Sequence, residues 1–189
     1  MPRIASTIFD LAREHDGVFT AAEAVDAGIS HEALAMSARR GTVRRLSRGI
    51  YRLIAYPANE EQVQLWEAVL WPTTRRGPIA GWGVLSHLTA LQLHYALLEY
   101  TPPKVSITIP TTLRIRRTPP AWLDIHRADL PGDDVTSDIG PPATTLERTL
   151  RDCLDAGVEN RLLRPVLEDS HLRDEMSAEQ IANLRERIG

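Results

Sequence analysis

Apolar residues recur at helical spacing in three stretches near the amino terminus, and each stretch predicts a helix. The first helix covers residues 3–15. Its apolar side would carry Ile4, Ile8, Leu11 and Ala12. The second follows the capping-box sequence Thr20–Glu23 and closes at Gly28, which can adopt the left-handed conformation common at helix ends. The third covers residues 31–40, with Ser30 as its N-cap. Two short helices joined by a tight turn therefore follow a longer one.

The pattern then changes from helical spacing to short β-rich runs. Residues 43–46 and 50–53 are such runs, and Ser47, Arg48 and Gly49 separate them. Gly49 can take the positive φ that a short hairpin loop requires. A hairpin directly after the second of two short helices is typical of a winged helix-turn-helix, with helix 31–40 as its recognition helix. We expect this domain to cover residues 1–56.

The rest of the chain mixes helical and strand patterns. A linker at 55–59 precedes a helix at 60–71, and an apolar stretch follows at 82–98, with Leu85, Leu88, Leu91 and Leu98 largely buried. Three short strands are expected at 105–109, 113–116 and 122–126, between proline-containing turns. Capping boxes at Thr144–Glu147 and Ser177–Gln180 open two more helices. Residues 60–189 are therefore expected to form a larger mixed α/β (α+β) domain.

The charge distribution adds a function to this picture. The chain has 189 residues and a net charge of −3, which does not by itself indicate a nucleic-acid partner. Residues 1–35 carry two arginines and six acids, whereas residues 36–56 carry no acid. The arginines of this acid-free segment are Arg39, Arg40, Arg44, Arg45, Arg48 and Arg52. A basic stripe on an acidic chain is a local electrostatic footprint of phosphate binding.

The candidate DNA contacts follow from the same elements. The core side would carry Ile29, in the turn before helix 31–40, and Leu34 and Ala38 on that helix. The face turned toward base edges would carry His31, Glu32, Ala35, Met36 and Arg39. The other arginines of the segment would bind phosphates, with Arg48 at the wing tip. A second basic group, Arg114, Arg116 and Arg117, lies at the predicted strand 113–116. It is either a second contact to DNA or an acidic partner, or a solvated face of the sheet.

Patterns typical of catalysis are missing. His87 and His94 stand seven residues apart, whereas a helix chelates a metal through residues three or four apart, so core or capping roles are expected for them. Cys153 reads as a buried structural thiol, and a single cysteine fits a cytoplasmic protein. The pair Asp133–Asp134 is expected in a solvated turn. Gly81–Gly83 is also predicted to form a turn and not a phosphate-binding loop. We expect no catalytic, cofactor or metal site, no enzyme activity and no membrane span.

In several sequence segments, the chain resembles the AbiEi-type antitoxins of type IV (AbiE) toxin–antitoxin systems. The resemblance begins with the wing sequence "GTVRRLSRGIYRL" at Gly41–Leu53. It continues in family order through Leu85–His94, Val105–Pro110, Asp124–Leu130 and Pro142–Cys153. Tyr95 departs from the glycine that usually follows the helix histidine, and the second domain is short.

The resemblance implies an antitoxin that binds operator DNA, with inverted repeats, and represses its own operon. The companion toxin in such systems typically has a nucleotidyltransferase fold, and antitoxin activity is associated with the second domain. Two other hypotheses remain open on the residues alone. The winged domain could be a protein–protein module that docks an acidic partner, or the chain could be a winged-helix regulator unrelated to a toxin. A nuclease or transferase would need carboxylate pairs that the sequence lacks.

Overall fold

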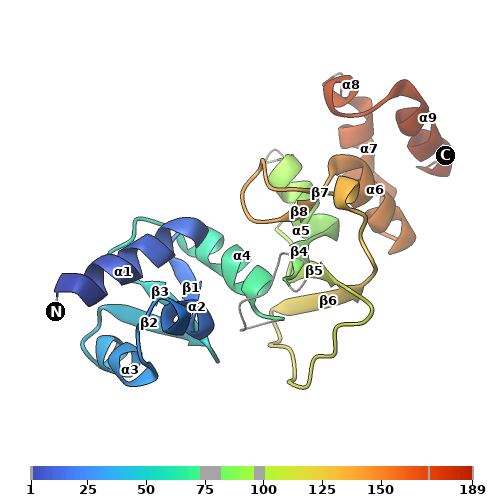
Figure 1. Ribbon diagram of the computed structural model, residues 1–189. Coiled ribbons are helices and arrows are strands. Elements are labelled where there is room, and N and C mark those ends of the chain that lie inside the picture. The colour runs from blue at the N-terminus through green and yellow to red at the C-terminus, as the bar shows by residue number, and fades with distance from the viewer. Residues whose placement is uncertain (1, 73–81, 96–100, 170, 189) are drawn as a thin grey trace. The chain divides into compact units, whose positions relative to one another are not determined.

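The computed structural model describes residues 2–72, 82–95, 101–169 and 171–188, and it mixes helices with sheet as the sequence predicts (Figure 1). The chain forms two compact units. One comprises Met1–Gly83 with Leu113–Ile115, and the other comprises Val84–Thr112 with Arg116–Gly189. The functional domain limits 1–56 and 60–189 stay proposals, because a compact unit is defined by contacts and not by function.

The first unit combines helices with a three-stranded antiparallel sheet of order β1-β3-β2. Its elements are α1 (Pro2–Ala12), the 3₁₀ turn η1 (Arg13–His15), β1 (Val18–Thr20), α2 (Ala21–Asp26), α3 (His31–Arg39), β2 (Val43–Ser47), β3 (Ile50–Leu53) and α4 (Glu60–Leu70). Strand β1 was not anticipated, because three residues are too few to show an alternating pattern. Helices α1 and α4 both pack against β1 and β3.

The core of the first unit lies between α1, the short helices and the sheet. Ile8 and Ala12 on α1 are buried together with Phe19 on β1, Leu34 on α3 and Val43 on β2. The helical spacing read from α1 therefore marks its buried side. This single core fixes α3 and the β2–β3 hairpin to one another.

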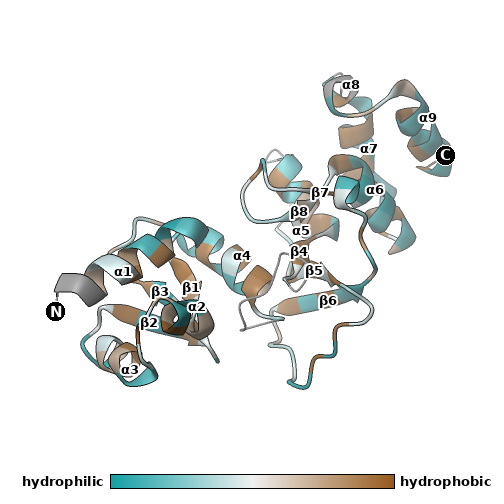
Figure 2. Ribbon diagram, viewed as in Figure 1, coloured by the Kyte–Doolittle hydropathy of each residue, from teal (hydrophilic) through white to brown (hydrophobic). Residues whose placement is uncertain are grey.

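The second unit has a five-stranded mixed sheet of order β6-β5-β4-β8-β7. Its strands are β4 (Val84–Leu85), β5 (Val105–Ile109), β6 (Leu123–Arg127), β7 (Val135–Thr136) and β8 (Ala143–Thr144), with the 3₁₀ turn η3 (Gly132–Asp134) before β7. Its helices are α5 (His87–His94), α6 (Leu146–Asp155), α7 (Asn160–Glu168), α8 (Leu172–Glu175) and α9 (Ala178–Ile188). In Figure 2, hydrophobic and hydrophilic residues alternate along α6 and α9, as expected for helices with one buried side.

A helical core holds the carboxyl-terminal part of the second unit together. Leu91 on α5, Leu150 and Cys153 on α6, Leu163 on α7 and Leu184 on α9 are all buried in it. Burial also raises the pKa of the Cys153 thiol to about 12, so the thiol stays protonated and unreactive at neutral pH. The structure thus agrees with a structural role for this cysteine.

The predicted strand at 113–116 is wrong, because this segment is irregular in the structure. Strands β5 and β6 pair directly and in parallel, from Val105–Leu123 to Ile109–Arg127. A parallel pair needs a connection that returns along the whole strand length, and residues 110–122 are that connection. Pro110, Pro119 and Pro120 also lack the amide hydrogen that a strand ladder uses.

The apolar stretch at 82–98 is divided between strand β4 and helix α5. Leu85 and Leu91 are fully buried and Leu88 is half-buried, as expected from the pattern. Leu98 and Gly81 lie outside the described residues. The break falls at Ser86 and His87, where His87 has a positive φ of 54°.

Two of the three predicted capping boxes are present. In the first, the Glu23 amide donates to Thr20 Oγ1 at 3.2 Å and the Thr20 amide donates to Glu23 Oε2 at 2.7 Å. In the second, Ser177 and Gln180 exchange the equivalent bonds at 3.2 and 2.7 Å. The prediction of a capping box at Thr144–Glu147 is wrong, because no side chain among the described residues caps the start of α6. Thr144 lies in β8 and its hydroxyl is bonded to Thr149 Oγ1 at 2.6 Å, so pairing in the sheet takes it away from the helix end.

His87 lies in a partly buried polar cluster of the second unit. Its ring stacks on that of His126 with centroids 3.6 Å apart, and its Nδ1 lies 2.9 Å from Ser86 Oγ. The pKa of His87 is lowered from 6.5 to about 4, mainly by burial and to a smaller extent by the neighbouring His126. The folded protein therefore binds this proton less tightly than the unfolded chain does.

Acidification should consequently destabilise the second unit. Because the folded-state pKa of His87 is depressed, its contribution to stability is complete above about pH 6.5 and is lost as the pH falls toward about 4. We expect wild-type protein to lose about 1–2 kcal/mol over this range through His87, since solvent screens the partly exposed ring. Urea unfolding at several pH values measures the effect. His87→Asn, which tolerates a positive φ, should flatten the dependence, and an unchanged dependence would contradict the assignment.

Candidate nucleic-acid interface

The turn between α2 and α3 is held by local hydrogen bonds that the sequence predicts. Gly28 has a φ of +85°, and the amide of Ile29 donates to the carbonyl of Ala24 at 2.8 Å. Ser30 Oγ then accepts from the Ala33 amide at 3.1 Å, which starts α3 at His31. These bonds fix the direction in which α3 leaves the turn, as a helix-turn-helix requires.

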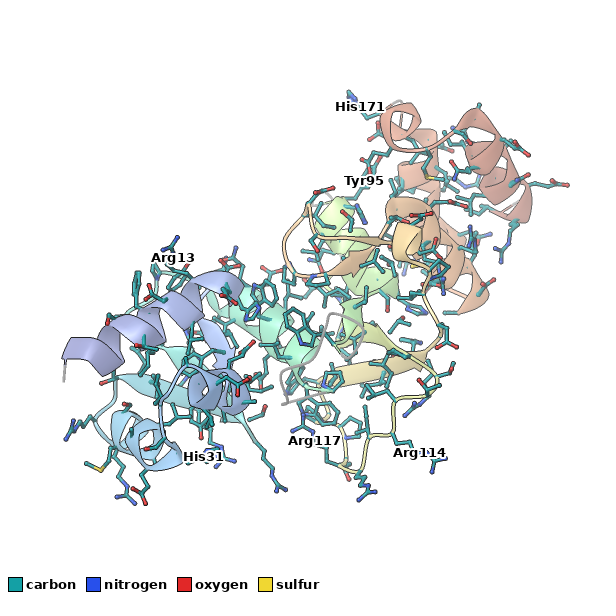
Figure 3. The ribbon with its side chains drawn as sticks, in the orientation of Figure 1. Arg13, His31, Tyr95, Arg114, Arg117 and His171 are labelled. Carbon is teal, nitrogen blue, oxygen red and sulfur yellow. The ribbon has the colours of Figure 1, made fainter. Side chains whose placement is uncertain are left out.

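Helix α3 presents the face that its spacing predicts. Leu34 is buried and Ala38 is half-buried against the core. The opposite face is exposed, and it carries His31, Glu32, Ala35, Met36 and Arg39. Figure 3 labels His31 at the start of this helix. The exposure of these side chains is confirmed, and their contact with base edges stays a prediction.

The β2–β3 hairpin forms a wing beside α3, which packs against β2. The hairpin loop is Arg48–Gly49, with Ser47 paired to Ile50, and Gly49 takes the positive φ of 82° expected of it. The carbonyl of Gly49 accepts a bond of 2.8 Å from the amide of Ala21, at the start of α2. The wing tip is therefore tied to the helix-turn-helix that it accompanies.

Five of the six arginines of the acid-free segment are exposed. They lie at the end of α3 and along the wing, and they are Arg39, Arg40, Arg44, Arg45 and Arg48. Arg45 donates from Nε to the Ser47 carbonyl at 3.3 Å, which still leaves its exposed guanidinium edge toward solvent. The exposed arginines of this segment therefore all belong to α3, its end and the wing of the first unit.

Arg52 differs from the other five. Its side chain is only 11% exposed, and it is paired with Glu60 and bonded to the Ala58 carbonyl at 2.7 Å. Arg52 lies opposite Arg44 in the hairpin register, and Glu60 accepts from Arg44 as well, at 2.9 Å. These contacts hold the Arg52 side chain where the wing meets the start of α4, and its contact with DNA stays a prediction.

Glu60 also belongs to this site, although its local sequence pattern marks it only as the first residue of helix 60–71. Its spacing of eight residues from Arg52 gives no helical or strand signal, because the pairing depends on where α4 packs. Hydrogen bonds from Arg44 and then Arg52 hold the pKa of the Glu60 carboxyl below its usual value.

The second predicted basic group is found on the irregular connection between β5 and β6. Arg114 and Arg116 are exposed and Arg117 is half-buried. Figure 3 labels Arg114 and Arg117 on this connection. Because the connection is not a strand, these arginines do not form a solvated face of the sheet, and that alternative is wrong. A role in binding stays a prediction.

Among the described residues, no group of three or more histidine, cysteine or acidic side chains is placed to hold a metal ion. His94 instead bonds through Nε2 to the Thr144 carbonyl at 2.8 Å. Asp134, predicted as part of a solvated turn, is half-buried and paired with Arg148 at 2.7 Å. No helix in the described ranges is long and apolar enough to cross a membrane.

Comparison with known proteins bears on both units. Residues 6–54 match the model of a family described as "Transcriptional regulator, AbiEi antitoxin", which confirms the resemblance over the amino-terminal region. Among curated proteins no sequence matches the chain. Among solved structures, the fold is similar to the crystal structure of the RV2827C protein from Mycobacterium tuberculosis, with a TM-score of 0.54 and 20% identity, over 98% of this chain and 72% of that one. At this identity the likeness concerns the fold.

Proposed function

We propose that this protein is an AbiEi-like antitoxin that binds operator DNA through its winged helix-turn-helix and represses its own toxin–antitoxin operon. The observation that carries the proposal is the surface shared by α3 and the wing. Exposed arginines gather there without any acid from residues 36–56, on the segment that matches the regulator family. A DNA duplex needs such a local positive surface, whatever the net charge of the chain.

In the proposed complex, α3 enters the major groove and the wing follows the phosphate backbone. Arg39 can reach a guanine edge, and His31 and Glu32 can donate to or accept from bases. Ala35 and Met36 offer few hydrogen bonds. Much of the selectivity would then come from the shape and deformability of the operator. Arg40, Arg44, Arg45 and Arg48 would bind phosphates, and Arg114, Arg116 and Arg117 would add a second contact.

The antitoxin part of the proposal rests on the family description and not on a site in the structure. The partner we propose is a nucleotidyltransferase-like toxin encoded beside this chain, and the operator we propose is an inverted repeat. Growth of cells that express the neighbouring gene, with and without this protein, tests the antitoxin activity. Failure of this protein to restore growth would count against it.

Salt titration tests the DNA-binding part of the proposal. If about four arginines neutralise phosphates, the logarithm of the association constant should fall with the logarithm of salt concentration at a slope of about −4. Fluorescence anisotropy with a labelled duplex, from about 50 to about 200 mM KCl, covers the useful range. A slope near zero would mean that the basic surface does not meet phosphates, and the proposal would fail.

A further inference from the structure

One carboxylate lies against the proposed DNA surface. Glu60 bridges two arginines of the wing: one of its carboxylate oxygens accepts from Arg44 at 2.9 Å and the other accepts from Arg52. Asn59 caps the helix that carries it, through a bond of 2.7 Å from the amide of Gln62. The helix start also favours a negative charge at this position. Glu60 is thus held beside the wing as an anion.

The two arginines of this bridge are held to different degrees. Arg52 is almost covered and also bonds the Ala58 carbonyl, so it anchors the bridge. Arg44 is 49% exposed and Glu60 is 72% exposed, so a phosphate can reach the Arg44 side of the bridge. A pair this exposed is held weakly and can exchange its anion. A second carboxylate of α4, Glu67, also lies within the electrostatic reach of Arg44.

We propose that Glu60 is an internal competitor for DNA phosphate, which occupies Arg44 and thereby lowers the sequence-independent affinity of the wing. The inference rests on the proposed DNA binding, because the competition concerns the same surface. A phosphate that binds Arg44 must displace the Glu60 carboxylate or share the guanidinium with it. An arginine that is already neutralised releases no DNA counterion until that exchange takes place.

Removal of the competing charge should therefore strengthen DNA binding. We expect Glu60→Gln to raise the affinity for a random-sequence duplex by about threefold to tenfold, and to make the salt slope more negative by about 1. If Glu60 served only to position Arg44 for phosphate, the same variant would bind DNA more weakly, and the proposal would be overturned. Thermal unfolding of the variant checks that the first unit stays folded.

Glu61→Gln is the matched control. Glu61 is exposed in the same turn of α4, and within the described residues its carboxylate has no hydrogen bond or ion pair. The Glu61→Gln variant removes the same charge as Glu60→Gln and leaves the bridge between Glu60 and the two arginines in place. Equal gains for both variants would reduce the effect to net charge and overturn the proposal. Arg44→Ala should weaken binding more in the Glu60→Gln background than in wild type, because the gain from removing Glu60 depends on the Arg44 guanidinium. A loss of equal size in both backgrounds would also overturn it.

A second readout separates this inference from the proposed function. Elution from heparin–agarose measures binding to a polyanion without any duplex. Glu60→Gln should elute at higher salt than Glu61→Gln even if wild-type protein binds no DNA, in which case the proposed function fails and the competition by Glu60 stands. If wild-type protein binds DNA with the expected salt slope but Glu60→Gln behaves as Glu61→Gln in both assays, the inference fails and the proposed function stands.

Discussion

Phe19→Ala should lower the free energy of unfolding of the first unit by about 3–5 kcal/mol. Phe19 is fully buried in β1, at the centre of the core shared by α1, α3 and the sheet. Its ring stacks on that of Tyr51, its partner in the β1–β3 register, with centroids 6.0 Å apart. Truncation would leave a cavity and remove this aromatic pair. A loss of this size is a large part of the stability of a small unit.

The other phenylalanine of the chain provides the control. Phe9 is 46% exposed on α1, so Phe9→Ala should cost less than about 1 kcal/mol. Urea unfolding followed by circular dichroism measures both variants. Similar losses for the two would show that the core between α1, α3 and the sheet is not organised around Phe19. Because that core holds α3 and the wing together, Phe19→Ala should also abolish DNA binding at temperatures where the first unit unfolds.

The double variant Arg45→Ala/Arg48→Ala should weaken DNA binding by about tenfold to 100-fold, to the same degree for every duplex sequence. Both side chains are exposed on the wing, one on β2 and one at the hairpin loop. Phosphate contacts carry no sequence information, so their loss should not relax any single base position. The salt slope should become less negative by about 2. Anisotropy titrations with two unrelated duplexes give both quantities.

Arg13 is the matched control for a single charge. It is exposed in the turn after α1, outside α3 and the wing (Figure 3). Arg13→Ala removes the same charge as Arg48→Ala from the same unit, and it should change the affinity less than about twofold. If Arg13→Ala and Arg48→Ala weaken binding equally, the protein responds to net charge alone and the wing is not the contact surface.

Local sequence signals predicted the first unit well. The capping box at Thr20 and the cap at Ser30 each join groups only three residues apart, and both are present in the structure. The turn glycines Gly28 and Gly49 also have the expected positive φ. The exposed face of α3 also follows from spacing alone. Such features depend on residues that are close together in the chain, so the local sequence contains both interacting groups.

In the second unit, local sequence patterns predicted helix caps and strands less reliably, because pairing in the sheet overrides them. Thr144 has the sequence of a capping box but belongs to β8, where its hydroxyl meets Thr149. Strands β4, β7 and β8 have two residues each, too few for an alternating pattern. Helices α7 and α8 were not anticipated, although Leu163 and Val166 of α7 are buried at helical spacing.

The sequence by itself determined the winged helix-turn-helix and the acid-free arginine segment 36–56, because caps, turns, helical spacing and charge counts are local. Only the tertiary structure decided how those arginines are used. It covers Arg52 and brings Glu60 against Arg44. It also makes residues 110–122 a crossing connection instead of a strand. The physical reason is that the packing of α4 on β3 and the parallel pairing of β5 with β6 join residues far apart in the chain, and no local pattern encodes such partners.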